Sequence, residues 1–159
     1  MKFYLIRHGK AAYNAPTDEA RPLTEEGIQQ AQRNGAFLKA LGVMPTAIYT
    51  SPRKRAQQTA QYIGSALNCD PIVDDAVNFE FTAQKALQLA TNHPPESSLI
   101  FVGHNPSMSE VVGQLTGTRT DMSTCAIAYI KDIDLPQARF ANLKWLMTPK
   151  ALNAIINSE

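Results

Sequence analysis

The stretch Lys2-Phe-Tyr-Leu-Ile-Arg7-His8-Gly9 (KFYLIRHG, residues 2–9) decides the fold. Its first six residues form a short apolar run that is typical of a buried strand, and the run ends at an arginine and a histidine. Residues 47–50, 71–73 and 98–102 form similar short runs, with helical patterns between them. Strands that alternate with helices predict a mainly parallel sheet.

Apolar residues at spacings of three and four predict the helices. Residues 23–41 form one such segment, which Thr24 can cap and Gly42 can end. Ser51 followed by Pro52 is typical of an N-cap and a first helical residue, so a second helix is expected to begin there.

The remaining pattern completes the fold. Asn105 and Pro106 repeat the cap and proline that open a helix. Further segments are helices at 82–92 and 149–156 and strands at 125–130 and 139–146. We therefore expect a three-layer α/β/α fold whose sheet has about six strands, is mainly parallel and carries one antiparallel edge strand.

Composition limits the classes of function. With 159 residues the chain has the size of one domain, and we expect a single domain over residues 1–159 without a lid subdomain. A net charge of +1 argues against nucleic acid or a membrane as partner. The first residues lack the pattern of a signal peptide, so a cytoplasmic location is expected. Cys69 and Cys125 are expected to be buried, unpaired thiols.

Reactive side chains follow three of the expected strands. They are Arg7-His8-Gly9, then Arg55 beyond residues 47–50, then His104-Asn105 beyond residues 98–102. Taken alone, each has an ordinary interpretation as a satisfied or solvated polar residue. Ligands bind at the carboxyl ends of parallel strands, however, so we expect these side chains to lie together. An arginine near a helix N-terminus costs about 0.3–1 kcal/mol unless an anion lies between them, which indicates a phosphate pocket.

The residue types indicate phosphoryl transfer. Arg7 and Arg55 can bind phosphoryl oxygens through their guanidinium groups. His8 offers an unprotonated ring nitrogen as nucleophile, and Gly9 would let the ligand approach closely. His104 would donate a hydrogen bond to the phosphoryl group. This chemistry needs no cofactor, and the histidines do not have the spacing of metal ligands.

Four sequence blocks, in order along nearly the whole chain, resemble the histidine phosphatase superfamily, whose fold is phosphoglycerate mutase-like. The blocks are Arg7-His8-Gly9, Arg21-Pro22-Leu23-Thr24, Ser51-Pro52 with Arg55-Ala56 and Thr59, and Gly103-His104-Asn105-Pro106. Within the superfamily they are most similar to the small SixA-type protein phosphohistidine phosphatases.

The resemblance implies a phosphohistidine intermediate on His8, with the phosphate held by Arg7, Arg55 and His104. Arg21 and Asn105 match the superfamily pattern and are expected at the substrate. For Arg21, contact with the substrate and support of its own loop remain equally open. The implied partner is a phosphohistidine-bearing protein, such as a phosphotransfer domain, and the product is inorganic phosphate.

The general acid is an open point. Glu80 lies where larger members of the superfamily place a carboxylate, and its neighbours Phe79 and Phe81 could desolvate it. The alternative is a surface glutamate between two anchoring rings. A phosphorylated ring nitrogen can itself be protonated as it leaves, so phosphohistidine tolerates a poor acid better than a phosphoester does.

Two other functions remain open. The first is a phosphomonoesterase for small phosphorylated metabolites, although the segment between the third and fourth strands is too short for a subdomain that closes over a sugar phosphate. The second is a phosphoprotein-binding module without catalysis, which the intact His8 argues against.

Overall fold

The apolar runs of the sequence assemble into one sheet. In the computed structural model, which describes residues 1–138 and 140–158, six strands follow the order β3-β2-β4-β1-β5-β6. The strands are β1 (Lys2–Arg7), β2 (Ala47–Thr50), β3 (Pro71–Val73), β4 (Ser98–Gly103), β5 (Ile127–Lys131) and β6 (Asn142–Met147). The first four strands in chain order pair with one another in parallel, as expected.

The antiparallel strand differs from the expectation in one detail. Strand β5 pairs antiparallel with both β1 and β6, so it lies one place inside the edge, and β6 is the edge strand. The reason is the short connection between β5 and β6, which favours an antiparallel neighbour. Strand β6 also begins later than residue 139; Arg139 itself lies outside the described residues.

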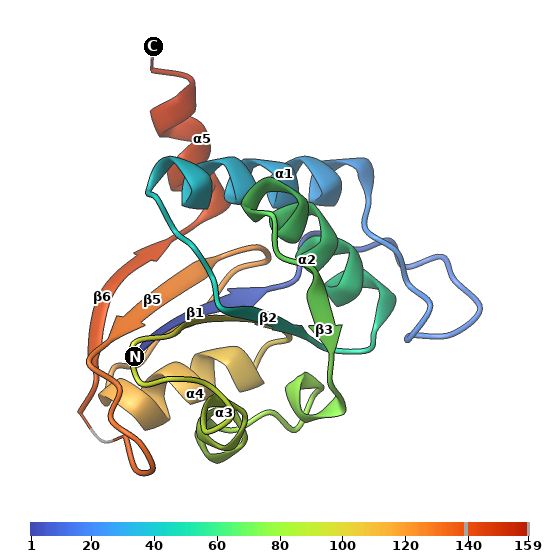
Figure 1. Ribbon diagram of the computed structural model, residues 1–159. Coiled ribbons are helices and arrows are strands. Elements are labelled where there is room, and N and C mark those ends of the chain that lie inside the picture. The colour runs from blue at the N-terminus through green and yellow to red at the C-terminus, as the bar shows by residue number, and fades with distance from the viewer. Residues whose placement is uncertain (139, 159) are drawn as a thin grey trace.

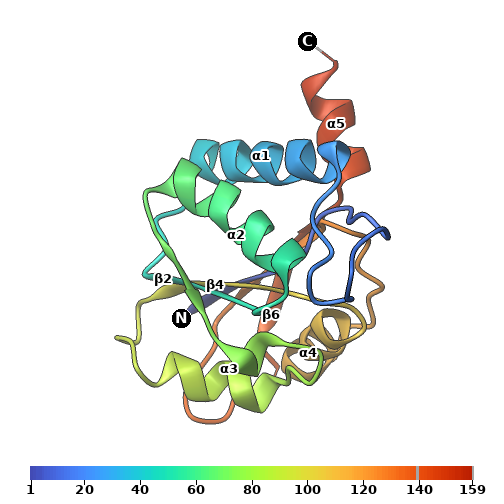
Figure 2. The ribbon, with the colours of Figure 1, turned by 90° about the vertical axis from the view of Figure 1, so that its right-hand side faces the viewer.

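Helices cover both faces of the sheet, with α1 and α2 on one side and α3 and α4 on the other (Figure 1). They are α1 (Glu25–Ala40), α2 (Lys54–Leu67), α3 (Ala83–Ala90), α4 (Ser107–Thr116), α5 (Pro149–Ile156) and the 3-10 helix η1 (Asp75–Val77). Figure 2 shows α5 extending beyond α1, away from the sheet.

Alternation along β1 divides the core between the two faces. Phe3 and Leu5 belong to the apolar cluster under α3 and α4, whereas Tyr4 and Ile6 belong to the cluster under α1 and α2. Successive side chains of a strand point to opposite faces, so a strand that is covered on both sides is apolar throughout. This explains why residues 2–6 lack the polar alternation of a half-exposed strand.

Helix α1 begins and ends where its signals predict. The Thr24 hydroxyl accepts a hydrogen bond from the Gly27 N–H at 3.0 Å, which satisfies one of the free donors of the first turn. Gly42, just past the last turn, has φ of 75°, in the left-handed region that glycine adopts without strain.

The start of α2 was predicted wrongly. The helix begins at Lys54 with Arg53 at its N-cap, and not at Pro52 after a Ser51 cap. Ser51 is held elsewhere, because its hydroxyl contacts the His104 ring at 2.7 Å. Pro52 therefore lies in a bend that precedes the helix.

Helix α4 also begins one residue later than its pattern predicts. Pro106 is the N-cap residue, and the Asn105–Pro106 peptide bond is cis. The Asn105 side chain still serves the helix, since its oxygen accepts hydrogen bonds from the Ser109 N–H at 3.2 Å and the Ser109 hydroxyl at 2.7 Å.

Both cysteines lie in the described part of the chain and are free thiols. Cys125 is fully buried, whereas Cys69 is only half-buried. Strand β5 starts after Cys125, whose φ of 59° interrupts the extended backbone expected from residue 125 onward. Over residues 1–138 and 140–158, no helix combines the length and the apolar character needed to span a membrane.

Candidate active site

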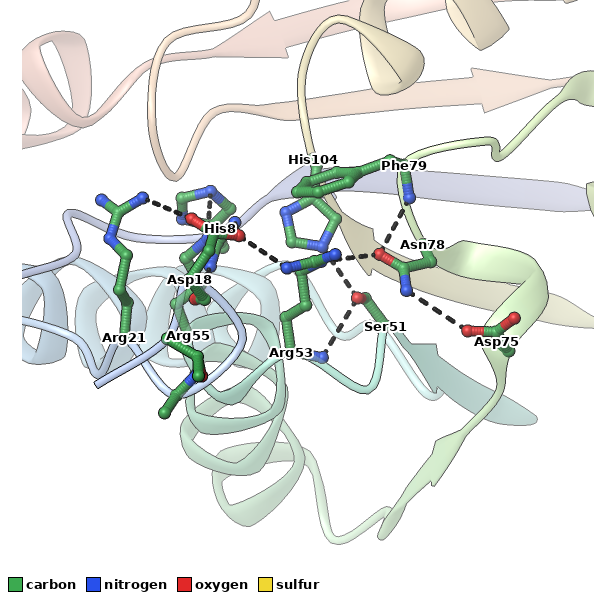
Figure 3. Close-up of polar contacts among 12 residues, drawn as sticks. His8, Asp18, Arg21, Ser51, Arg53, Arg55, Asp75, Asn78, Phe79 and His104 are labelled. Carbon is green, nitrogen blue, oxygen red and sulfur yellow. Dashed lines mark hydrogen bonds and ion pairs between the residues drawn. The ribbon is translucent and has the colours of Figure 1, made fainter. Parts of the chain in front are cut away.

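The carboxyl ends of β1, β4 and β2, which are neighbours in the sheet, meet at one cavity of about 380 Å³. Its lining consists of Arg7, His8, Lys10, Ala11, Tyr13, Asp18, Arg21, Arg55, Phe79, His104, Asn105 and Thr124. The structure thus brings together six of the side chains singled out in the sequence: Arg7, His8, Arg21, Arg55, His104 and Asn105. Figure 3 shows several of them in close-up.

His8 is fixed at the end of β1 by its backbone and by its ring. Its N–H donates to the Gly103 carbonyl at 2.9 Å. Its ring Nδ1 donates to the Gly9 carbonyl at 2.7 Å, because a carbonyl can only accept. The tautomer is therefore set, and Nε2 keeps its lone pair, which is the form a nucleophile requires.

Burial keeps the His8 ring neutral. Desolvation is the main cause that lowers the pKa of His8 to about 4; the hydrogen bond to Gly9 opposes the shift, and the charges of Arg55, Arg7 and Arg21 add to it. The charged form of a histidine loses hydration when it is buried and is repelled by guanidinium groups. His8 is therefore unprotonated at neutral pH.

Arg55 lies in the first turn of α2 and contacts the His8 ring. Its Nε donates to His8 Nε2 at 3.3 Å. Its Nη1 donates to the Asp18 carbonyl at 2.8 Å, and its Nη2 lies 3.2 Å from the Asp18 carboxylate. The side chain is almost fully buried, so its charge acts on the cavity with little screening.

Asp18 was not identified in the sequence. Its carboxylate contacts Arg21 at 3.1 Å, Arg53 at 2.6 Å and Arg55 at 3.2 Å. Partial desolvation works to raise the pKa of Asp18, but the hydrogen bonds and charges of these arginines outweigh it and hold the pKa below its ordinary value. Asp18 thus supplies an anion to the guanidinium groups at the cavity (Figure 3).

Arg7 and Arg21 approach the cavity from two sides. Arg7 donates from Nη1 to the Met122 carbonyl at 2.9 Å, and its buried Nε has no hydrogen-bond partner among the described residues. Arg21 donates from Nε to the Ala12 carbonyl at 2.8 Å, so it braces its own loop as well as lining the cavity. A buried N–H without a partner is uncommon and leaves Arg7 able to donate to a ligand.

His104 lies between Ser51 and Phe79 (Figure 3). Its Nε2 contacts the Ser51 hydroxyl at 2.7 Å, and the Phe79 ring meets it edge-on with centroids 4.7 Å apart. Desolvation, followed by the charges of His8, Arg55 and Arg53, lowers the pKa of His104 to about 3. Like His8, His104 is a neutral ring at neutral pH.

Asn105 lines the cavity but is held mainly by its neighbours. Its side-chain nitrogen donates to Asp121 at 3.3 Å, and its oxygen accepts from Ser109. Both ends of the amide thus have partners within the chain. This favours a role for Asn105 in shaping the start of α4 over a direct contact with substrate.

Of the two interpretations left open for Glu80, the structure favours a surface glutamate. Although Phe79 also reaches the cavity, Glu80 is exposed and lines a separate hollow with Asp75, Asn78, Phe79 and Lys85. Its aromatic neighbours therefore do not desolvate it, and it does not reach the cavity.

Gly9 does not open space for a ligand. A Cβ at this position would lie 2.8 Å from the Gly27 carbonyl oxygen and 3.3 Å from Leu23, so the glycine is needed for close packing between β1 and α1. Its N–H donates to the Thr59 hydroxyl at 3.0 Å. Gly9 acts on the site through its carbonyl, which orients the His8 ring.

Comparison with known proteins agrees with this geometry. The model of the histidine phosphatase superfamily (branch 1) matches residues 3–80. The phosphohistidine phosphatase SixA of Escherichia coli (strain K12) is 30% identical over 158 residues, which cover 94% of this chain and 94% of that protein. The chain belongs to the histidine phosphatase superfamily.

Solved structures of the superfamily share its fold. The structure of the protein histidine phosphatase SixA complexed with tungstate has a TM-score of 0.86 and 26% identity, covering 96% of this chain and 99% of that one. A mycobacterial glucosyl-3-phosphoglycerate phosphatase has a TM-score of 0.67 and 15% identity over 81% of this chain and 89% of its own, which supports the fold alone.

Asp18, Ser51, Arg53 and Phe79 were not assigned to the site from the sequence. Asp18 and Arg21 stand three residues apart, a spacing that allows an ion pair, but nothing local shows that Arg53 and Arg55 join them. Over residues 1–138 and 140–158, no three His, Cys, Asp or Glu side chains gather as metal ligands would.

Proposed function

We propose that this chain hydrolyses phosphohistidine on a protein substrate through a phosphohistidine intermediate on His8. The observation that carries the proposal is the His8 ring, whose Nδ1 is bound to the Gly9 carbonyl and whose Nε2 lone pair lies 3.3 Å from Arg55. Similarity to the Escherichia coli phosphohistidine phosphatase SixA over 94% of the chain supports the same substrate class.

In the first step, His8 Nε2 forms a bond to phosphorus while the P–N bond of the substrate breaks. The electron pair of that bond goes to the leaving imidazole, which leaves as a neutral ring after its other nitrogen has taken a proton from solvent. Arg7 and Arg55 would neutralise the charge on the phosphoryl oxygens. The positive charge that develops on the His8 ring is stabilised by the Gly9 carbonyl at 2.7 Å.

In the second step, water attacks the phosphorus of phospho-His8. The P–N bond to His8 breaks, its electron pair returns to Nε2, and the phosphoryl group leaves as inorganic phosphate with the oxygen and the protons of the water. Arg55 must give up its 3.3 Å contact with Nε2 for the first step and can regain it after the second.

The identity of the acids at the cavity favours a P–N substrate. Among the described residues that line the cavity, Asp18 is the only carboxylic acid, and it is ion-paired to three arginines. An acid with a lowered pKa is a weak proton donor at neutral pH. Phosphohistidine needs such a donor less than an alkyl phosphate does.

The short segment between β3 and β4 supports a single domain without a lid, and with it a macromolecular substrate. Between β3 and β4 the chain forms η1 and α3, and α3 packs against α4.

A phosphomonoesterase for small metabolites remains the alternative. The two functions differ in substrate preference. We expect kcat/KM for a phosphorylated phosphotransfer domain to be well above kcat/KM for a sugar phosphate.

The test is a rapid-mixing experiment with a ³²P-labelled phosphohistidine protein. We expect a burst of acid-labile label on the wild-type chain, and neither label nor turnover with His8→Ala, which should still bind phosphate. Chelator should have no effect. Turnover without label would contradict the intermediate, and activity that chelator removes and a divalent ion restores would contradict the metal-independent mechanism.

A further inference from the structure

A buried serine contacts the second histidine of the cavity. The Ser51 Oγ and His104 Nε2 atoms are 2.7 Å apart, and the two residues are 0% and 1% exposed. Ser51 follows β2 and His104 follows β4, so two neighbouring strands of the sheet set this distance. Loss of either partner would leave a buried polar group unsatisfied, which is costly.

The direction of this hydrogen bond follows from the donor and acceptor capacity of the Ser51 hydroxyl. A hydroxyl has one proton to donate and two lone pairs that accept. One lone pair accepts from the Arg53 N–H at 3.3 Å. In the described structure the His104 ring is the one other group at hydrogen-bond distance from Oγ, so the hydroxyl proton is satisfied only by donation to Nε2.

The other ring nitrogen fits this direction. His104 Nδ1 is buried and has no hydrogen-bond partner among the described residues. It lies on the side of the ring toward His8, whose ring centroid is 5.2 Å from that of His104 (Figure 3). A phosphoryl group bound at His8 would therefore meet this nitrogen, and an N–H there attracts the anion, whereas a lone pair repels it.

We propose that Ser51 is a positioning residue that holds His104 in its Nδ1–H tautomer, so that Nδ1 donates to the phosphoryl group. This inference rests on the proposed phosphoryl chemistry but not on phosphohistidine as the substrate. In water the Nε2–H form of neutral histidine predominates, so the serine reverses the intrinsic preference. Since the ring is neutral in this site, its tautomer decides whether Nδ1 carries a proton.

The direct test is ¹⁵N NMR of the histidine rings. The chain has three histidines, so single His93→Asn and His104→Asn variants assign the signals. We expect a protonated Nδ1 and an unprotonated Nε2 at His104 in the wild type, and inorganic phosphate should shift the Nδ1–H resonance downfield. A wild-type His104 with its proton on Nε2 overturns the inference whatever the variants do.

The kinetic test uses Ser51→Ala and Ser51→Thr. Loss of the hydroxyl should move the His104 proton toward Nε2 and lower kcat by about 10- to 100-fold, as loss of a residue that orients a functional side chain does. Threonine keeps the hydroxyl and should restore both the tautomer and most of the activity. A Ser51→Ala protein that is folded and keeps both the wild-type tautomer and the wild-type kcat contradicts the inference.

Ser107→Ala is the matched control. Ser107 is also a buried serine beside His104, but its hydroxyl donates to the His104 main-chain carbonyl at 2.9 Å and not to the ring. Its loss should leave the tautomer unchanged. Activity on an aryl phosphate should respond to Ser51→Ala as activity on phosphohistidine does, so failure of the substrate proposal can be told from failure of this one.

Discussion

Two neutral histidines and several guanidinium groups share one cavity, and the arrangement is stable because Asp18 lies among the arginines. Arg21, Arg53 and Arg55 each contact the Asp18 carboxylate. Without an anion, these positive charges would repel one another across the mouth of the site. Asp18 therefore supplies the negative charge that offsets this repulsion.

The Asp18 carboxylate and a bound phosphate would compete for the same arginines. We therefore expect Asp18→Asn to tighten the binding of inorganic phosphate. The Asp18 carboxylate contacts Arg55, which would also bind the phosphate, and a carboxylate beside the phosphate repels it. Asp18 is about half-exposed, so the gain should be modest, about two- to fivefold in Kd, as for exposed ion pairs. Isothermal titration calorimetry would measure it.

The matched control for Asp18→Asn is Glu19→Gln. It removes one negative charge from the same loop, and the Glu19 side chain is exposed. Phosphate affinity should change less than with Asp18→Asn. Weaker phosphate binding by Asp18→Asn would show instead that the carboxylate is needed to organise the arginines.

At the scale of elements, the signals that lie within one segment predicted the structure well. Residues 47–50, 71–73 and 149–156 were expected and observed with the same bounds, because apolar spacing and a leading proline act locally. Ser51 was misread as a helix cap because its partner, His104, lies 53 residues away. The contacts of Asp18 with Arg53 and Arg55 were missed for the same reason.

The junction between β1 and α1 is the element contact on which His8 depends. A Cβ on Gly27 would lie 2.1 Å from the Lys10 carbonyl oxygen. That oxygen belongs to the backbone two residues after His8, so we expect a shift there to displace His8 as well. We expect Gly27→Ala to lower the free energy of unfolding by about 1–3 kcal/mol, as overpacking does, and to lower kcat as well.

Gly113→Ala is the control for this effect. Gly113 lies inside α4, where a Cβ would meet only the Thr118 carbonyl oxygen, at 3.5 Å. This variant should be stabilised by about 0.5–1 kcal/mol, since alanine is the better helix former. Urea unfolding of both variants would measure the difference, and a Gly27→Ala protein as stable and as active as the wild type would contradict the packing argument.

At the scale of the whole molecule, the cavity makes stability depend on pH. The pKa values of His8 and His104 are lowered to about 4 and about 3 in the folded chain, whereas an unfolded histidine titrates near pH 6.5. Below pH 6.5 the two histidines therefore bind protons in the unfolded chain but remain neutral in the folded chain. The free energy of unfolding falls as pH falls from about 6.5 toward 4, and the loss is absent above that window.

We expect each histidine to contribute up to about 1.4 kcal/mol per pH unit to this slope. Asp18, whose pKa is lowered, acts in a more acidic window, since its stabilisation is lost only as its own carboxylate protonates. Urea unfolding of the wild type and of a His8→Asn, His104→Asn double variant at pH 7.5, 6.5, 5.5 and 4.5 would separate the two effects. The double variant should have a markedly flatter profile between pH 6.5 and 4.5; equal slopes would mean that the two rings take up protons in the folded chain as readily as in the unfolded one.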